Sequence, residues 1–347
     1  MKYNNKRNSL NELRFYLAFV VVTIHMAYLA DTQLTKEILF FTYPLASRAV
    51  DLFFVLSGFL IYMSWDRNKL TKDYSYKRFF RLYPLYSVVV ISIPILHYLF
   101  FGGDANFRNI IYYLLANLTF MNFLYPVIPG VFEGNNHGII NGALWSLKVE
   151  VMFYIALPFV YWFIERAKKP VYIVLFLFLA SLIFNCMLLM LEKYFSINLG
   201  PLYNQLPSKF YLFVLGIALY KYFYFFCIVM KSFIGVTVFA LIIFLAFFWG
   251  GFDFSLSILV CMLALCAGLL NKKFAFFSAK ADYSYSIYIT HFPIIQFMLA
   301  FGVEFNSLLD LAIYLIVQAI VSMLCWKVVE YNSLRIGRDL IRGYKCV

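Results

Sequence analysis

Charged residues are scarce in this chain of 347 residues. Asp, Glu, Lys and Arg make up 13% of the sequence, about half the share that soluble domains carry. Hydrophobic residues make up 64%, and the mean hydropathy is +0.80. The apolar runs are too many and too long for the core of a soluble domain. The composition therefore excludes a soluble protein and predicts an all-α polytopic membrane protein.

Cysteine motifs are lacking as well. The six cysteines include no Cys-x-x-Cys pair and no Cys–His grouping with metal-site spacing. Most of them lie in or near apolar segments, where cysteine usually serves as a small apolar side chain. We therefore expect neither disulfides nor a bound metal. The sequence also lacks an aromatic–basic motif for RNA, so we expect no nucleic-acid partner.

Basic residues outnumber acidic ones, 29 to 17, and they are unevenly placed. Most of them fall between alternate apolar segments, and by the positive-inside rule those stretches face the cytoplasm. The pattern predicts about ten transmembrane helices with cytoplasmic N- and C-termini, in contact with anionic lipids. The predicted spans are 10–30, 46–65, 83–101, 143–163, 171–191, 206–226, 232–250, 254–271, 283–301 and 307–329.

Two apolar segments need a separate interpretation. Residues 110–125 are apolar, but another crossing there would break the alternation, so we expect a re-entrant or interfacial segment on the outer side. The first segment has a charged start, as a signal peptide does. However, Tyr28 is a poor residue before a cut after Ala30, so we expect a retained anchor.

Arg14 and His25 both lie inside the first apolar segment, eleven residues apart. On a helix, their side chains point in nearly the same direction and are separated by about 16 Å along the axis. An ionisable side chain at membrane depth costs roughly 2.5–3.5 kcal/mol, so it usually has a function. Taken singly, Arg14 could be an interfacial anchor and His25 a structural histidine. Together they predict a polar track from the cytoplasmic surface towards mid-membrane.

A second pair of arginines precedes the third segment. Arg78 and Arg81 are three residues apart, so they share a helix face. The planar guanidinium fork suits phosphate groups, so the pair either only fixes the topology or, with Arg14, binds a phosphorylated ligand. In the second segment, Asp51 lies near the outer end. Ser57 adds a small polar position that suits helix packing or substrate contact.

Polar residues also lie within later segments. Glu150 follows Trp145 and Ser146, about two turns inside the fourth segment. A buried carboxylate without a partner is costly, so we expect Glu150 to meet a polar group of another helix, with His25 as the candidate. His291 is a further mid-depth imidazole, close to the helix-perturbing Pro293, and is either structural or functional.

Five stretches together resemble the membrane-bound acyltransferase 3 family, which includes O-antigen and peptidoglycan O-acetylases. They occur in order over nearly the whole chain, although Lys148 stands where the family usually has a small or hydroxyl residue. The resemblance implies a single membrane domain over residues 1–347 without an appended soluble domain. The stretches are Arg14 with His25, Asp51–Ile61, Arg78 with Arg81, Trp145–Glu150 and Ser284–His291.

The activity that the resemblance implies is O-acyl transfer in the cell (inner) membrane. The implied donor is cytoplasmic acetyl-CoA, and the acceptor is a hydroxyl of a cell-surface or lipid-linked polysaccharide. The implied partners are this glycan and the lipid bilayer, with a homo-oligomer or a glycan-assembly partner also compatible. A transporter of a glycan stays an alternative, although the chain lacks the internal repeat that transporters often show. A structural membrane subunit is the other alternative.

The resemblance also implies roles for single residues. The phosphates of the donor would contact Arg14, Arg78 and Arg81. His25 would act as general base and Glu150 would orient its imidazole, following the logic of a hydrolytic triad. The candidates for substrate contact or acyl transfer are Asp51, Ser57, Trp145, Ser146 and His291.

Overall fold

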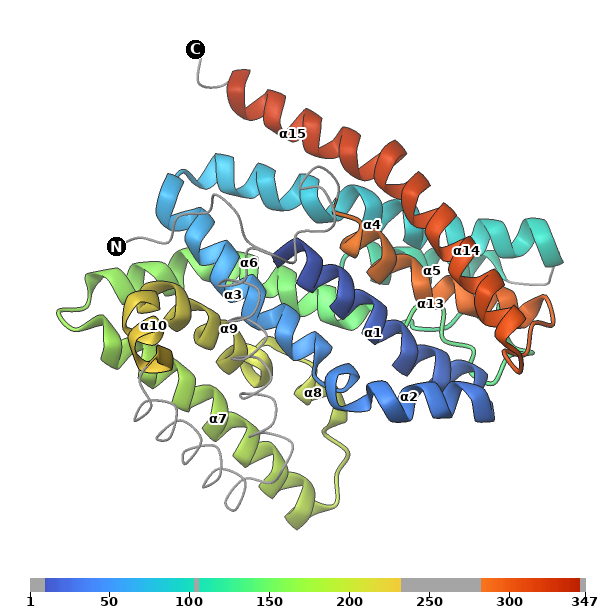
Figure 1. Cartoon of the computed structure of the whole chain (residues 1–347), viewed down its shortest axis with the longest axis horizontal. Helices are drawn as coiled ribbons and strands as arrows, with labels where there is room; N and C mark the ends of the chain where they lie inside the picture. The colour runs from blue at the N-terminus through green and yellow to red at the C-terminus, as the bar shows by residue number, and fades with distance from the viewer. Residues whose placement is uncertain (1–9, 103–105, 232–281, 344–347) are drawn as a thin grey trace. The chain divides into compact units, whose positions relative to one another are not determined.

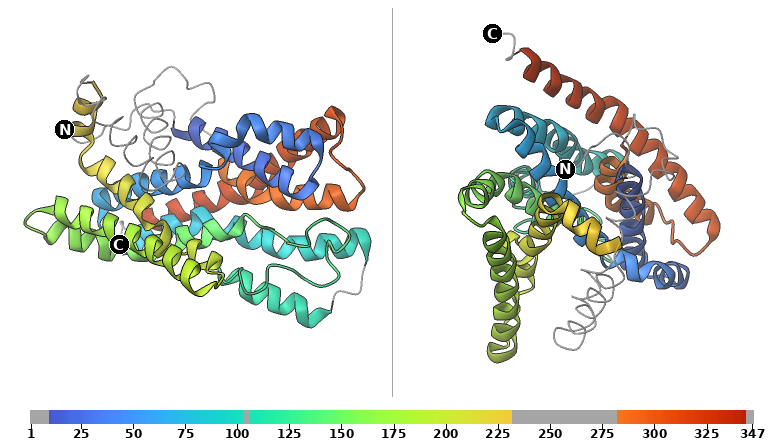
Figure 2. Two further views of the ribbon diagram at one scale, coloured as in Figure 1. Left: turned by 90° about the horizontal axis from the view of Figure 1, so that it is seen from below. Right: turned by 60° about the vertical axis from the view of Figure 1, so that its left-hand side comes forward.

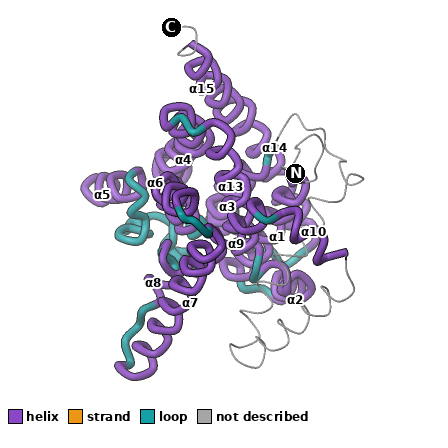
Figure 3. Tube along the Cα trace, turned by 90° about the vertical axis from the view of Figure 1, so that its left-hand side faces the viewer, coloured by secondary structure: helices purple, strands orange, loops and turns teal. Residues whose placement is uncertain are grey.

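The structure is a computed structural model, and it describes residues 10–102, 106–231 and 282–343 (Figure 1). Within these ranges all regular secondary structure is helical, as Figure 3 shows, apart from an isolated β-bridge between Val127 and Ile139. The predicted all-α class is confirmed for this part of the chain. The elements are α1 (Leu10–Ala30), α2 (Gln33–Ala46), α3 (Ala49–Asn68), α4 (Thr71–Phe101), α5 (Phe107–Leu118), α6 (Leu144–Arg166), α7 (Pro170–Phe195), α8 (Gly200–Tyr203), α9 (Leu206–Lys221), α10 (Phe223–Lys231), α13 (Ser284–Ala300), α14 (Leu308–Cys325), the π-helical turn η1 (Trp326–Glu330) and α15 (Tyr331–Gly343).

Six helices in the described ranges are long and apolar enough to cross a membrane. They are α1, α3, α4, α6, α7 and the continuous helix from α14 through η1 to α15. A polytopic membrane protein is the architecture that this set indicates. The predicted spans 232–250 and 254–271 lie outside the described residues. The number of ten spans and the cytoplasmic termini therefore stay predictions.

Two other predicted spans take a different form. Residues 206–226 divide into α9 and α10 at Tyr222, so neither helix alone has the length of a typical span. Residues 283–301 form α13, which has 17 residues and lies at the lower limit of that length. In both cases the hydropathy pattern predicted the apolar stretch. It did not predict the interruption between α9 and α10 or the short length of α13.

Two helices lie between the long ones. α5 has 12 residues, about 18 Å at 1.5 Å per residue, and cannot cross a hydrocarbon core of about 30 Å. This length is compatible with the predicted interfacial or re-entrant segment at 110–125. α2 was not predicted. It begins with a capping box between Thr32 and Thr35 and folds back beside α1, where the hydroxyls of Thr23 and Thr42 lie 2.8 Å apart (Figure 2).

The chain divides into two compact units. Unit 1 comprises Met1–Arg14, Arg48–Asn68 and Val149–Lys280. Unit 2 comprises Phe15–Ser47, Lys69–Lys148 and Ala281–Val347. The described part of unit 1 is built on α3, α7, α9 and most of α6. Unit 2 contains most of α1 together with α4, α13, α14 and α15.

Unit 1 is held together by a close crossing of α3 and α9. A Cβ on Gly58 would lie 2.2 Å from the carbonyl oxygen of Phe213, and one on Gly216 would lie 2.1 Å from that of Val55. No side chain fits at either position, so the two glycines let the helix backbones touch. Gly58, beside the candidate Ser57, is therefore a packing residue.

Unit 2 is organised around α13, whose side chains are nearly all buried, including those of the polar residues Ser286, His291 and Gln296. α4 and α14 pack against α13, and α15 runs along α4 (Figure 1). Outward-facing positions carry large apolar side chains instead, such as Ile316 on α14. An exterior of this kind suits lipid tails, while the polar groups gather inside the unit.

Candidate functional site

Two imidazoles meet inside unit 2. His25 of α1 and His291 of α13 are 266 residues apart, yet Nδ1 of His25 lies 2.8 Å from Nε2 of His291. The ring centroids are 4.9 Å apart with an interplanar angle of 32°. His291 is fully buried, whereas His25 is partly exposed. Two residues that the sequence singled out separately therefore form one hydrogen-bonded pair, which had not been predicted.

The surroundings of the pair are mostly apolar or aromatic. The ring of Phe292 meets the ring of His25 edge-on, with centroids 5.3 Å apart, and the ring of Tyr288 lies 5.9 Å from that of His291. On its other side, His291 places Nδ1 3.2 Å from the carbonyl oxygen of Ile287, one turn earlier in α13. His291 thus has a hydrogen-bond partner at each ring nitrogen.

Side chains from neighbouring segments fix the rotation of α13. Pro293 has no N–H, so the carbonyl of Ile289 lacks its usual partner four residues later. The buried amide of Asn141 donates to that carbonyl at 3.0 Å and so replaces the missing bond. The hydroxyl of Ser146, one of the predicted site residues, is hydrogen-bonded to that of Tyr288, one turn before Pro293.

The loop after α5 is tied over the ends of α1 and α13. The amide of Asn136 donates to the carbonyl of Leu29 at 3.0 Å, one turn beyond His25. From α13, the amide of Gln296 donates to the carbonyls of His137 and Ile139, at 2.6 Å each. The loop therefore bonds both helices about one turn beyond their histidines.

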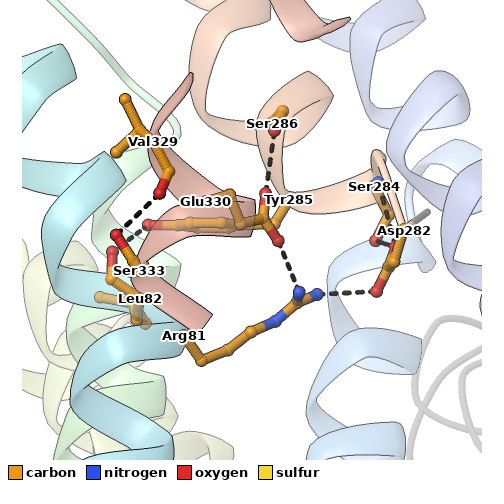
Figure 4. A network of polar contacts seen from close by, with 9 residues as sticks. All are labelled: Arg81, Leu82, Asp282, Ser284, Tyr285, Ser286, Val329, Glu330 and Ser333. Atoms are coloured by element: carbon orange, nitrogen blue, oxygen red, sulfur yellow. Dashed lines mark hydrogen bonds and ion pairs between the residues drawn. The ribbon is translucent and has the colours of Figure 1, made fainter. Parts of the chain in front are cut away.

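Arg81 lies at the centre of an ion network in unit 2 (Figure 4). Its guanidinium donates through Nη2 to Asp282, at 2.7 Å, and through Nη1 to Glu330 of η1. The side chain of Glu330 is only 1% exposed, and its other oxygen accepts a hydrogen bond from Ser286 at 2.9 Å. Arg81 thus links α4 to η1 and to the beginning of α13.

This network bears on the predicted role of Arg81. Both arms of its guanidinium are engaged by carboxylates, and the three charges sum to −1. A phosphate would have to displace one of these carboxylates in order to bind. Glu330 was not predicted as a site residue, because it follows the last predicted span and resembles a polar residue at the membrane boundary. Its only signal was an acidic residue at the start of an otherwise basic stretch.

Glu150 has its contacts in unit 1. Its Oε1 accepts hydrogen bonds from the hydroxyl of Ser57 at 3.0 Å and from that of Tyr154 at 2.7 Å. Two predicted site residues, Ser57 and Glu150, are thereby brought together, and a polar partner for Glu150 from another helix is found. The partner named by the sequence analysis, His25, belongs to unit 2, so that pairing stays a prediction.

The remaining candidates lie on four different helices. Arg14 lies in the second turn of α1 and is partly exposed. Arg78 lies on α4 with its guanidinium carbon 5.8 Å from the centroid of the Tyr74 ring. Asp51 and Trp145 lie in the first turns of α3 and α6. In the described part of the chain, no group of three or more His, Cys, Asp or Glu residues is placed to hold a metal ion.

Comparison with known proteins adds the last finding. A family model described as an acyltransferase domain matches residues 7–327. An O-acetyl transferase of Shigella phage Sf6 is 25% identical over 84% of this chain and 86% of its own length. Acyltransferase MdmB of Streptomyces mycarofaciens is 29% identical over 47% of this chain and 41% of its own length. Peptidoglycan O-acetyltransferase OatA of Listeria monocytogenes is 28% identical over 35% and 21%, respectively. The chain spans less than half the length of the last two, and no solved structure matches it.

Proposed function

Because the chain belongs to the acyltransferase family whose domain model covers residues 7–327, we propose that it transfers acetyl from cytoplasmic acetyl-CoA to a hydroxyl of a cell-surface or lipid-linked polysaccharide. The observation that carries the proposal is the contact between His25 and His291. Polar side chains among apolar helices are costly unless they are paired, and they usually mark a function. Two relatives whose names specify O-acetyl transfer and peptidoglycan support the acceptor class.

The reaction needs a group that takes one proton and returns it. The acceptor hydroxyl oxygen attacks the thioester carbonyl carbon, so a C–O bond forms and the C–S bond breaks. The hydroxyl proton passes to His25 and then to the departing CoA thiolate. His25 suits this role better than His291 because His291 is fully buried, whereas His25 keeps part of its surface exposed. General base catalysis of this kind contributes typically 10²–10⁴-fold.

The donor would approach along α1. Arg14 and His25 lie on this one helix, about 16 Å apart along its axis and on the same face, a distance comparable to the reach of a pantetheine arm. We place the donor phosphates at Arg14 and Arg78, because both lie near helix ends that the distribution of basic residues predicts to face the cytoplasm. Arg81 is the third proposed contact for the donor phosphates, and a phosphate would bind there by displacing Asp282 or Glu330 from its guanidinium.

The acceptor would be held by residues on other helices. The proposed contacts for the acceptor are Asp51, Ser57, Trp145 and Ser146. Glu150 is proposed as a group that orients or stabilises the reacting centre. The proposal also includes the cell (inner) membrane as location, both termini in the cytoplasm, and a homo-oligomer or a glycan-assembly partner.

The test is mass spectrometry of surface glycans from cells with and without this gene, complemented by the wild type, His25→Ala or His25→Gln. Wild type should restore one acetyl group per repeat, and both variants should lower the transfer rate about 10²-fold or more at equal membrane insertion. Normal transfer by His25→Gln would refute the assignment of the base. If cells without the gene had normally acetylated glycan but less of it at the surface, the result would indicate the transporter alternative. Binding of CoA to the purified protein would contradict that alternative.

A further inference from the structure

We propose that His291 fixes the tautomer of His25, holding a proton at Nδ1 so that the lone pair of Nε2 is available to the acceptor hydroxyl. The inference rests on the proposed function of His25 as general base. His291 acts through His25 and is therefore a positioning residue.

The carbonyl oxygen of Ile287 can only accept a hydrogen bond. It lies 3.2 Å from Nδ1 of His291, so that nitrogen carries the hydrogen. A neutral imidazole has one N–H and one lone pair, so Nε2 of His291 is an acceptor. Nδ1 of His25, at 2.8 Å from it, is then the donor. The lone pair of His25 is left at Nε2, on the other side of its ring.

The opposite assignment is unfavourable. If Nδ1 of His25 were the acceptor, a neutral His291 would carry its hydrogen at Nε2. Its Nδ1 would then direct a lone pair at the carbonyl oxygen of Ile287, only 3.2 Å away. A doubly protonated His291 would avoid this repulsion but would place a cation at a fully buried position, which is costly.

The surrounding structure holds His291 in the required orientation. Its acceptor, Ile287, is on the same helix, so this bond depends only on the helix geometry and the rotamer. The helix itself is fixed next to His291 by Asn141, which bonds the carbonyl of Ile289, and by Ser146, which bonds Tyr288. The buried histidine is therefore the rigid member of the pair.

The arrangement also suits the charged intermediate state. When His25 takes the hydroxyl proton at Nε2, its Nδ1–H still donates to Nε2 of His291, so neither ring needs to turn. In the Ser-His-Asp triad, the buried Asp carboxylate accepts a hydrogen bond from Nδ1–H of the basic histidine and thereby fixes its tautomer. Here a neutral imidazole takes the place of the carboxylate.

The direct test is ¹⁵N NMR of the protein in lipid nanodiscs, with labelled histidine and the other two histidines removed as His97→Gln and His137→Gln. Imidazole ¹⁵N shifts separate protonated from unprotonated nitrogens. Above about pH 8, where an ordinary imidazole is neutral, both rings should carry hydrogen at Nδ1 and a lone pair at Nε2. Adding His291→Phe should lower the fraction of His25 that carries hydrogen at Nδ1, although the carbonyl of Val21, one turn earlier in α1, remains as an acceptor for this imidazole. Hydrogen at Nε2 of His25 with His291 in place would overturn the proposal.

Kinetics supply a readout that a merely structural role would not move. His291→Phe keeps an aromatic ring but removes the acceptor, so we expect kcat to fall about tenfold to a hundredfold with an unchanged KM for acetyl-CoA. His291→Gln offers an amide oxygen and should recover most of the loss. Equal activity of the Phe variant and the wild type, or equal loss in both variants, would contradict the proposal.

His97→Gln is the matched control. His97 is another buried imidazole of unit 2, and its Nε2 accepts from the backbone N–H of Phe132 at 3.3 Å. Its replacement should leave kcat unchanged. The NMR result does not depend on turnover, so the two proposals can fail separately. A wild-type protein without acetyl transfer would refute the proposed function. Hydrogen at Nε2 of His25 in an active protein would refute only this inference.

Discussion

At the scale of single residues, the ionisable side chains of His25 and Arg81 bond to groups from distant segments of the chain. His25, Glu150 and Arg81 were each recognised from their type and depth. The partner of His25 is an imidazole from a segment 266 residues later, and Arg81 pairs with two carboxylates that no local pattern marked. A partner of this kind depends on which helices pack together, and side-chain periodicity along one helix does not contain that information.

Lys148 illustrates the same limit. Lys148 lies near the end of a predicted span, a position from which a lysine can extend outward to the membrane surface. Its side chain is instead buried, with Nζ 4.4 Å from the centroid of the Phe123 ring. The aromatic ring that accepts the cation comes from the loop after α5, a contact that no feature of the span itself predicts.

The ion network of Arg81 leads to a prediction about stability. Arg81→Ala removes the cation that pairs with the buried carboxylate of Glu330, which should lower the free energy of unfolding by about 3–5 kcal/mol. Adding Glu330→Gln removes the charge of that carboxylate and should recover part of the loss. Thermal unfolding in detergent measures both. An Arg81→Ala protein of wild-type stability with a higher KM for acetyl-CoA would instead identify Arg81 as a donor ligand.

At the scale of elements, the apolar runs located the helices well. α1 coincides with the first predicted span, and α6 and α7 begin within one residue of theirs. The misses have physical reasons. α2 is amphipathic and too short for a hydropathy window. α4 begins twelve residues before the predicted span because helix formation does not require apolar residues, and its first turns are polar.

The compensation at Pro293 can be tested by a double-mutant cycle. Asn141→Ala leaves the carbonyl of Ile289 without its donor in a buried position, which should cost about 1–3 kcal/mol of stability. Pro293→Ala supplies a backbone N–H to the same carbonyl, so the double variant should be more stable than Asn141→Ala alone. Chemical unfolding of the four proteins in detergent gives the coupling free energy. Strict additivity of the two changes would contradict this account of Asn141.

At the scale of the whole molecule, the sequence predicted the class and the family correctly. Composition indicated a helical membrane protein, and the five motifs identified the acyltransferase family. The division into two compact units was not foreseen, because both units are assembled from segments far apart in the chain. Gly58 and Gly216 illustrate the reason. A glycine in the sequence indicates that another helix can approach closely there, but it does not indicate which helix.

Orientation in the membrane is testable from outside the cell. The distribution of basic residues predicts Arg108 on the outer side and Lys168 on the cytoplasmic side, and both are exposed. In a cysteine-free background, Arg108→Cys should react with an impermeant maleimide in intact cells. Lys168→Cys should react only after permeabilisation. The reverse pattern would contradict the predicted topology.

The contact between His25 and His291 also has a consequence for biosynthesis. The two imidazoles are separated by 266 residues of chain, and ribosomes add about 5–20 residues per second. Roughly ten to fifty seconds therefore pass between synthesis of the first histidine and synthesis of the second. During that time the nascent chain holds His25 without the imidazole to which it is hydrogen-bonded in the complete fold. Under the proposed roles of the two histidines, a chain whose translation stops before His291 should transfer acetyl at least tenfold to a hundredfold more slowly than the complete protein.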